Sequence, residues 1–383
     1  MRMRNACILF GACCMIILSL AGCWDIRSVQ DINYIAALGI DYKDGKYVVY
    51  TQSLDFSNVA KQEGMKSTGK TPVWVGRGEG YSLDSAVNDL YTTSSLQILW
   101  DHTTVIIFSE HALQQDVNKM IDSVFRFSGI RYTPWVFGTK ESIPDLFTLP
   151  IPFNQSPVAS ILHAPNDVLK QQAYIPPVQL YRMVVELNEP GSTLLLPSMS
   201  INKKKWTEND KEVDQYQING VYALQDGIFR SWFNLKHMHG IRWLSEKITR
   251  TPINIGSGEK PEAVLALTKP KSSLSVAIRG LDPKFKLKID VNGYIEEVMG
   301  SLSEAEIISL AKQEIRDEVR HTWEQGLRKK VDVYSLRKYV YRNCNKKWKR
   351  AQNGALLQLT PDSLDSIEVN VHIEHAGMNR LRR

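Results

Sequence analysis

Hydrophobic residues recur at every second position in some stretches of the chain and at every third or fourth position in others. The first period is typical of half-buried strands and the second of amphipathic helices. In the first half, strands are predicted at 32–40, 46–54, 73–75, 104–109 and 135–138, and helices at 83–95, 113–127, 156–172 and 176–187. Asp44-Gly45 is expected to turn the first two strands into a hairpin, and Ser82 to cap the first helix.

The second half of the chain contains more strictly alternating segments. Strands at 217–224 and 227–233 are expected to form a hairpin that turns at 225–227. Residues 284–291 alternate between hydrophobic and mostly basic side chains. The dipeptide Asn292-Gly293 that follows is typical of a hairpin turn, here leading to a strand at 294–298.

The C-terminal third combines two predicted helices with a last strand. Ser303 and Glu306 have the spacing of a capping box and predict a long helix that reaches about Lys330. Its apolar stripe is formed by Ile308, Ala311, Ile315, Val319 and Trp323. A helix at 333–350 is expected to bury Leu336, Val340, Cys344 and Trp348. Alternation at 367–373 predicts the last strand.

Strands and helices in this order predict an α+β (mixed α/β) fold with several domains. It should contain mixed β-sheets packed with helices, and a C-terminal sheet with one long amphipathic helix. The polar residues at 188–215 suggest a domain boundary near 195–215. The predicted division is therefore a leader at 1–22, an N-terminal domain at 23–200 and a C-terminal domain at 201–383, with a further break near 270 left open. Residues 57–72 are polar and predict a loop.

The N-terminus has the pattern of a secretory leader. Arg2 and Arg4 precede an apolar run at 6–20, which is short for a membrane span and suitable for a signal sequence. The run ends in Leu20-Ala21-Gly22-Cys23, which resembles a bacterial lipobox. We expect cleavage between Gly22 and Cys23, with S-diacylglycerol and an optional N-acyl group on Cys23. The alternative is an uncleaved anchor helix.

Composition narrows the class of protein. The 383 residues are 43% hydrophobic and 23% charged, which excludes a disordered chain. The net charge of +6 is too small to indicate nucleic-acid binding by itself. Of the five cysteines, three lie in the leader and Cys23 is the predicted lipid carrier. Cys344 is then left alone, so we expect neither an intramolecular disulfide nor a cysteine-based zinc site.

Candidate chemistry in the rest of the chain is sparse. The glycines at 76–80 lack the third glycine of a dinucleotide-binding loop at the required spacing, so a structural turn is the preferred interpretation. His237 and His239 form an extended pair with no recognisable third ligand for a metal ion. We find no nucleophile elbow and no cysteine beside a base. The sequence therefore predicts no enzyme activity, no cofactor and no metal.

The remaining titratable candidates have structural interpretations. His102 is expected to be a hydrogen-bonded residue before a buried strand, and His372 and His375 to point to opposite faces of a strand. The carboxylate pair Glu296-Glu297 is interpreted as a solvated face.

Residues 328–350 carry ten basic side chains against one acidic side chain. Such a face is commonly just solvated. The functional interpretation is a contact with anionic lipid or an acidic partner through Arg337, Arg342 and Lys346.

Several segments, in this order, resemble the Ger(x)C lipoproteins, the C subunits of spore germinant receptors. They are Cys23-Trp24-Asp25, the strand pair at 32–54, the segment 76–113, the segments QINGVYALQDGIFRSWFN and GIRWL, and the ending SIEVNVHIEHAGM. Residues 331–335 depart from the Gly-rich segment that many members carry there.

The resemblance implies a lipid-anchored receptor subunit that is needed for spore germination. It also implies A-type and B-type membrane subunits as partners, and a place on the outer face of the cell membrane and on the inner spore membrane. A lipid-anchored solute-binding protein remains the alternative, and a surface hydrolase is disfavoured by the lack of a catalytic constellation.

Overall fold

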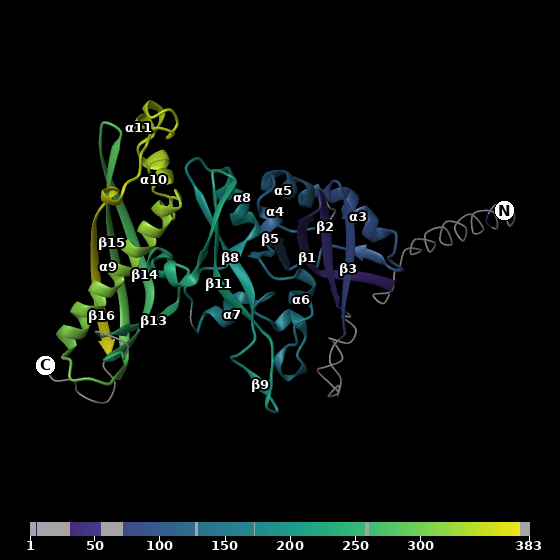
Figure 1. Ribbon diagram of the computed structural model, residues 1–383, viewed down its shortest axis with the longest axis horizontal. Coiled ribbons are helices and arrows are strands. Elements are labelled where there is room, and N and C mark those ends of the chain that lie inside the picture. The colour runs from purple at the N-terminus through teal and green to yellow at the C-terminus, as the bar shows by residue number, and fades with distance from the viewer. Residues whose placement is uncertain are drawn as a thin grey trace.

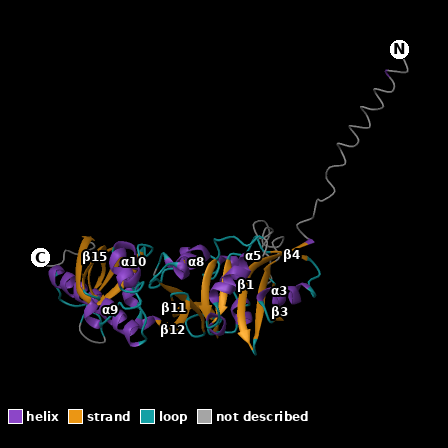
Figure 2. Cartoon of the chain, turned by 90° about the horizontal axis from the view of Figure 1, so that it is seen from above, coloured by secondary structure: helices purple, strands orange, loops and turns teal. Residues whose placement is uncertain are grey.

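The computed structural model describes Asn5 and residues 31–54, 72–126, 129–171, 173–256 and 260–375 (Figure 1). The leader apart from Asn5, the predicted lipidation site Gly22-Cys23 and the predicted loop at 57–72 (except Pro72) lie outside these residues. Figures 1 and 2 show an elongated body with one large sheet toward the N-terminal end and a smaller sheet, with helices beside it, toward the C-terminal end. Within the described residues, no helix is both long and apolar enough to cross a membrane.

The N-terminal unit is built on a ten-stranded mixed sheet. Its main path runs β12-β11-β8-β6-β5-β1-β2-β3, while β4 pairs with β1 and β7 pairs with β6. The strands are β1 (Ile32–Lys43), β2 (Lys46–Leu54), β3 (Val73–Gly80), β4 (Gln97–Leu99), β5 (Val105–Ser109), β6 (Trp135–Thr139), β7 (Val178–Gln179), β8 (Thr193–Asn202), β11 (Gln215–Gln225) and β12 (Ile228–Asn234). The four strands β1, β5, β6 and β8 are parallel, and the flanking hairpins are antiparallel.

Helices cover both faces of this sheet. The helices are α3 (Leu83–Tyr91), α4 (Glu110–Leu113), α5 (Val117–Arg126), α6 (Ile143–Phe147), α7 (Pro165–Leu169) and α8 (Leu180–Asn188). One hydrophobic cluster joins the sheet to α3, α4, α5 and α8, and a second joins its other face to α6. Two short 3-10 turns, η2 (Pro152–Asn154) and η3 (Pro157–Ala159), follow α6. The small β9 (Thr207–Glu208) and β10 (Lys211–Glu212) hairpin projects from this unit.

The glycine-rich segment lies within strand β3, so the predicted turn at 76–80 is wrong. Gly78 pairs with Val49 of β2 in a regular antiparallel ladder. A Cβ atom on Gly78 would lie 2.2 Å from the carbonyl oxygen of Ala86, and one on Gly80 would lie 2.1 Å from Ser85 Oγ. The glycines therefore allow α3 to pack directly against the strand. Ser82 caps α3 as predicted.

The C-terminal unit is a four-stranded sheet beside a 25-residue helix. Its strands are β13 (Arg250–Ile255), β14 (Ala263–Arg279), β15 (Asp282–Val298) and β16 (Leu364–His375), and its helices are α9 (Glu304–Arg328), α10 (Leu336–Asn343) and α11 (Asn345–Arg350). The 3-10 turns η4 (Leu235–His237), η5 (His239–Leu244) and η6 (Pro361–Ser363) complete it. The mixed sheets and packed helices confirm the predicted α+β class.

The alternation at 284–291 is confirmed, but the predicted turn at Asn292-Gly293 is wrong. Strand β15 continues through both residues, and Gly293 pairs with Leu267 of β14. A Cβ atom on Gly293 would lie 2.5 Å from the carbonyl oxygen of Ala266, so the glycine serves close strand approach. The real hairpin turn between β14 and β15 lies at 280–281, where Gly280 has a φ of +62°.

Helix α9 begins with the predicted capping box, in which Ser303 Oγ accepts from the Glu306 amide. Its buried stripe is formed by Ile307, Ala311, Ile315, Val319 and Trp323, so Ile307 replaces the predicted Ile308 at the fully buried position. The predicted helix at 333–350 is broken in two. Cys344 separates α10 from α11 with φ −131° and ψ 46°, and its side chain is partly buried against the core.

The two units share one hydrophobic core. Val221, Ala223 and Phe233 of the large sheet belong to the same buried cluster as Phe285 of β15 and the stripe of α9. The predicted division at 200/201 falls inside strand β8, which pairs with β11 in the same sheet. The break left open near 270 coincides with an irregularity inside β14, between Thr268 and Lys271.

Candidate functional site

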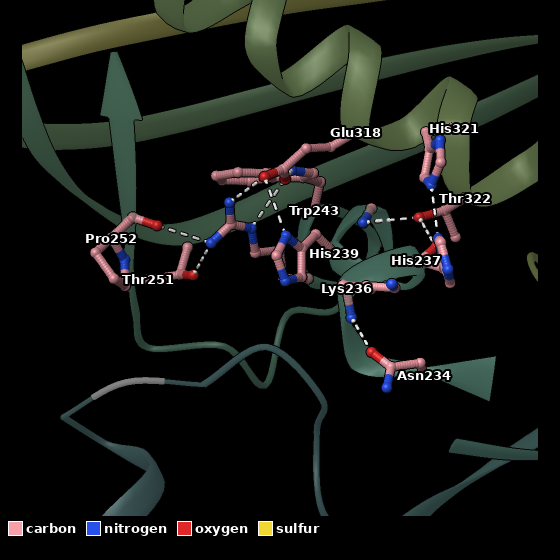
Figure 3. A network of polar contacts seen from close by, with 12 residues as sticks. Asn234, Lys236, His237, His239, Trp243, Thr251, Pro252, Glu318, His321 and Thr322 are labelled. Carbon is pink, nitrogen blue, oxygen red and sulfur yellow. Dashed lines mark hydrogen bonds and ion pairs between the residues drawn. The ribbon is translucent and has the colours of Figure 1, made fainter. Parts of the chain in front are cut away.

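A buried ion pair fastens η5 to the middle of α9 (Figure 3). The Arg242 side chain is almost fully buried, and its Nε and Nη2 donate to the Glu318 carboxylate at 3.0 and 2.5 Å. Its Nη1 donates to Thr251 Oγ1 at 2.8 Å and to the carbonyl oxygen of Pro252 at 2.7 Å. A guanidinium matches a carboxylate in this two-pronged geometry, which orients both groups. The pair thereby ties η5, α9 and β13 together.

Aromatic rings enclose this ion pair. Trp243 Nε1 donates to Glu318 Oε2 at 2.6 Å. The Arg242 guanidinium lies 4.7 Å from the ring centre of Tyr174 and 4.6 Å from that of Trp243. His239 stacks on Tyr174 at 4.7 Å between ring centres, and burial lowers the pKa of His239 although Glu318 opposes that shift. Because Tyr174 comes from the N-terminal unit, the network spans both units.

His237 and His239 do not form the extended pair that the sequence predicts. They belong to two successive 3-10 turns, separated by the buried Met238. His237 Nδ1 lies 3.0 Å from His321 Nε2, whereas His239 Nδ1 lies 3.7 Å from Glu318 Oε1. The described ranges contain no group of three or more His, Cys, Asp or Glu residues placed to hold a metal ion. Burial, followed by the charge of Lys236, lowers the pKa of His237.

The basic segment at 328–350 is divided by the fold into two parts. Arg337 pairs with Asp226 at 3.3 Å, and Arg342 forms a two-pronged pair with Glu189. Between them Lys338 Nζ lies 2.6 Å from Glu186 Oε2 and 3.5 Å from Glu189 Oε2. Two of the three predicted contact residues thus bind the N-terminal unit of their own chain. We call this set of ion pairs the junction.

The other predicted contact residue, Lys346, lies on α11 and is exposed. Lys347, Lys349 and Arg350 are exposed beside it. These four basic side chains form the α11 basic patch.

Asp332 is a buried residue that holds the start of α10, which carries the junction residues Arg337, Lys338 and Arg342, against the large sheet. It is almost fully buried, and its carboxylate accepts from the backbone amides of Leu336 at 3.0 Å and Arg337 at 2.8 Å. Its own amide donates to Gln225 Oε1 of the large sheet at 2.9 Å. Burial raises the pKa of Asp332 to about 6, against the opposing effect of these backbone hydrogen bonds. Ser335 Oγ also accepts from the Thr193 amide at 3.0 Å.

A second buried polar cluster lies under the N-terminal sheet. His163 is buried, with Nδ1 2.6 Å from Thr104 Oγ1 and Nε2 2.9 Å from Gln52 Oε1. Gln52 Nε2 in turn donates to the carbonyl oxygen of Phe147 at 2.7 Å. Burial lowers the pKa of His163 to about 4, so the ring is neutral near pH 7. His163 also lines an open pocket of about 440 Å³.

The other candidate residues are dispersed. His102 lies 3.9 Å from Asp101 Oδ2 and packs edge-on against Tyr34. Glu296 forms an ion pair with Arg250, so it is not simply solvated as predicted. His372 is exposed on β16. Gly22 and Cys23 lie outside the described residues, so the lipidation site stays a prediction, as does the side-chain direction of His375.

Sequence reasoning missed Glu318, His163 and Asp332. Asp332 carried a usable signal, since it stands between two valines as the sole acid of the basic segment. Arg242 carried a similar one, because it is enclosed by Ile241 and Trp243. His163 had no comparable signal, because its partners are distant in the sequence.

Comparison with known proteins identifies the class. The N-terminal domain of spore germination proteins matches residues 25–201, and the spore germination B3/GerAC-like C-terminal domain matches residues 219–377. The chain belongs to the Ger(x)C-like family of spore germination proteins.

Relatives found by sequence and a solved structure of similar fold each cover most of the chain. Spore germination protein KC of Bacillus subtilis (strain 168) is 22% identical over 395 residues, which span 98% of this chain and 97% of the relative. Spore germination protein B3 of the same organism is 24% identical over 294 residues, 75% of this chain and 74% of the relative. The crystal structure of the GerBC protein has the same fold at 13% identity, with a TM-score of 0.54, and covers 88% of this chain and 97% of that one.

Proposed function

We propose that this chain is the C subunit of a nutrient germinant receptor, anchored by lipid on Cys23. The observation that carries the proposal is the match of both halves, in order, to spore germination domains. Relatives named as germination proteins KC, B3 and A3 support it. In this proposal A-type and B-type membrane subunits are its partners. It lies on the outer face of the cell membrane and, in spores, on the inner spore membrane.

In this proposal the chain acts by assembling or operating the receptor, without catalysis. The junction and the shared core support a rigid docking body, because they hold the two units in one arrangement. The lipid tether would concentrate this body at the membrane surface, so modest contacts with membrane subunits can suffice. The α11 basic patch is then the part of the predicted contact face that remains available to a partner.

The test replaces the chromosomal copy by Cys23→Ala in the source bacterium. Spores should lose germination through this receptor, while germination through other receptors stays intact. Palmitate labelling of the protein should disappear. Cys344→Ala is the matched control and should leave both properties unchanged. Undiminished labelling of Cys23→Ala would refute the anchor, and normal germination of a deletion strain through every receptor would refute the role.

A lipid-anchored solute-binding protein is the second candidate, and the pocket beside His163 is the observation that favours it. Calorimetry on the purified chain from Trp24 onward decides between the two. The receptor-subunit proposal expects free amino acids and sugars to bind no better than about millimolar, roughly −4 kcal/mol. Micromolar binding of one nutrient would support the solute-binding function instead.

A further inference from the structure

The pocket is formed by segments from both units. One side comes from residues 163–177 around α7, and the other from the turn at 247–249, which leads from η5 into β13. Trp135 of the large sheet provides an aromatic wall. Both ring nitrogens of His163 are engaged by Thr104 and Gln52, so the ring contributes surface without a free hydrogen-bonding nitrogen. Selectivity must therefore come from the other polar side chains.

The charges around the pocket are unbalanced in favour of cations. Asp167 is paired with Lys170 at 2.9 Å. Lys247 has no carboxylate within ion-pair distance among the residues that the structure describes. Burial, and then the nearby charge of Arg182, lower the pKa of Lys247, while Tyr181 and Glu186 act in the opposite direction. Lys247 lies on the exposed side of the pocket, and an incoming anion would offset the repulsion between its ammonium and Arg182.

We propose that this pocket binds a small phosphate-type oxyanion, with Lys247 as its principal counter-charge. The Asn166 amide and the Thr249 hydroxyl supply neutral donors at the same pocket, whereas the charge of Lys170 is already balanced by Asp167. The volume of about 440 Å³ admits inorganic phosphate or a small phosphate ester. A neutral amino acid suits the pocket less well, because its single carboxylate is accompanied by its own ammonium group.

Occupancy of the pocket would add a link between the two units, since its lining comes from both. Hydrogen bonds of Arg250 already connect them, since its Nη1 donates to the carbonyl oxygen of Gln171 at 2.6 Å. The Ala173 amide also donates to the carbonyl oxygen of Arg250 at 3.4 Å. An anion held by Lys247 on one side and by the Asn166 amide on the other would add a bridge to this connection. Bound anion should therefore raise the unfolding temperature of the whole body.

The test is calorimetric titration of inorganic phosphate into the chain from Trp24 onward, at constant ionic strength. Lys247→Met should weaken phosphate binding at least tenfold and remove the phosphate-dependent rise in unfolding temperature. Lys346→Met, which removes an equally charged exposed lysine from the α11 basic patch, should bind like the parent chain. Equal affinity of Lys247→Met and the parent would overturn the site, as would the absence of saturable binding up to 20 mM (about 2 kcal/mol at the 1 M standard state).

Glycerol 3-phosphate provides the second arm. Tighter binding of the ester assigns the site to a phosphate ester such as a headgroup, and equal binding assigns it to the free anion. Either result supports the oxyanion site, provided that Lys247→Met abolishes the binding that was measured. These measurements use the unlipidated chain and need no germination, so their failure would leave the proposed receptor function untouched.

Discussion

Arg242 and Glu318, which are 76 residues apart in the sequence, form a two-pronged ion pair. The rings of Trp243 and Tyr174 pack against the Arg242 guanidinium. Removing Arg242 leaves the largely buried Glu318 carboxylate with only the Trp243 indole and His239 beside it, and breaking a buried ion pair typically costs about 3–5 kcal/mol. We therefore expect Arg242→Ala to lower the free energy of unfolding by that amount in urea denaturation. Arg126→Ala breaks an exposed pair on α5 and should cost at most about 1 kcal/mol.

Arg242→Lys separates charge from geometry at the same position. Lysine keeps the positive charge but lacks the planar fork that contacts Glu318, Thr251 and Pro252 together. We expect a stability between those of the parent and Arg242→Ala. A cost below 1 kcal/mol for Arg242→Ala would contradict the structural role given to this ion pair.

The low pKa of His163 implies that its contribution to the free energy of unfolding is lost in acid. Its folded pKa of about 4 lies below the value of 6.5 expected in the unfolded chain, so the unfolded state takes up the proton first. The contribution is fully present above pH 6.5 and is lost as the pH falls toward 4. It amounts to about 3 kcal/mol. Urea denaturation of His163→Gln between pH 4 and 7 should lack this component.

The pKa of Asp332 implies that the stability of the fold changes with pH in the opposite direction over nearly the same pH interval. Its folded pKa of about 6 lies above the ordinary value of 3.8, so the folded state holds the proton more tightly. This contribution is present below pH 4 and is lost as the pH rises through 6, again by about 3 kcal/mol. The two groups should nearly cancel in the parent chain. In Asp332→Asn the free energy of unfolding should then rise with pH, because only the contribution of His163 remains. In His163→Gln it should fall with pH, because only the contribution of Asp332 remains.

Charge reversal separates the junction from the α11 basic patch. Arg342→Glu faces Glu189 and should destabilise the folded chain by about 1 kcal/mol, with partial recovery in the double variant Glu189→Arg, Arg342→Glu. Reversing Lys346, Lys347 and Lys349 together should leave folding unchanged. It should weaken association with membrane subunits, most strongly at low salt. Normal assembly of this triple variant would show that the patch is only a solvated surface.

Cys344 predicts one slowly reacting thiol. Its side chain is partly buried at the break between α10 and α11. Titration of the chain from Trp24 with a thiol reagent should give one group that reacts slowly under native conditions and rapidly in urea. Immediate native reaction would contradict its packing against the core.

Local patterns predicted most elements of this fold, because alternation and capping act over a few residues. The capping box at Ser303 and the turn at 225–227 were correct for that reason. Asn292-Gly293 was misinterpreted because a local turn signal gave way to pairing with β14, whose partner residues Thr268 and Leu267 are 24 and 26 positions away. The basic segment was assigned to external partners because its acidic partners, such as Glu189, are 153 residues distant in the sequence.

The shared core also determines how the chain can be divided. A fragment that begins at residue 219 starts inside β11 and leaves behind β8, the strand to which β11 is bonded. It would present an unpaired strand edge to solvent, and it would still carry Val221, Ala223 and Phe233 in its own core. Because the core is continuous between the two units, we expect them to unfold together in one cooperative transition.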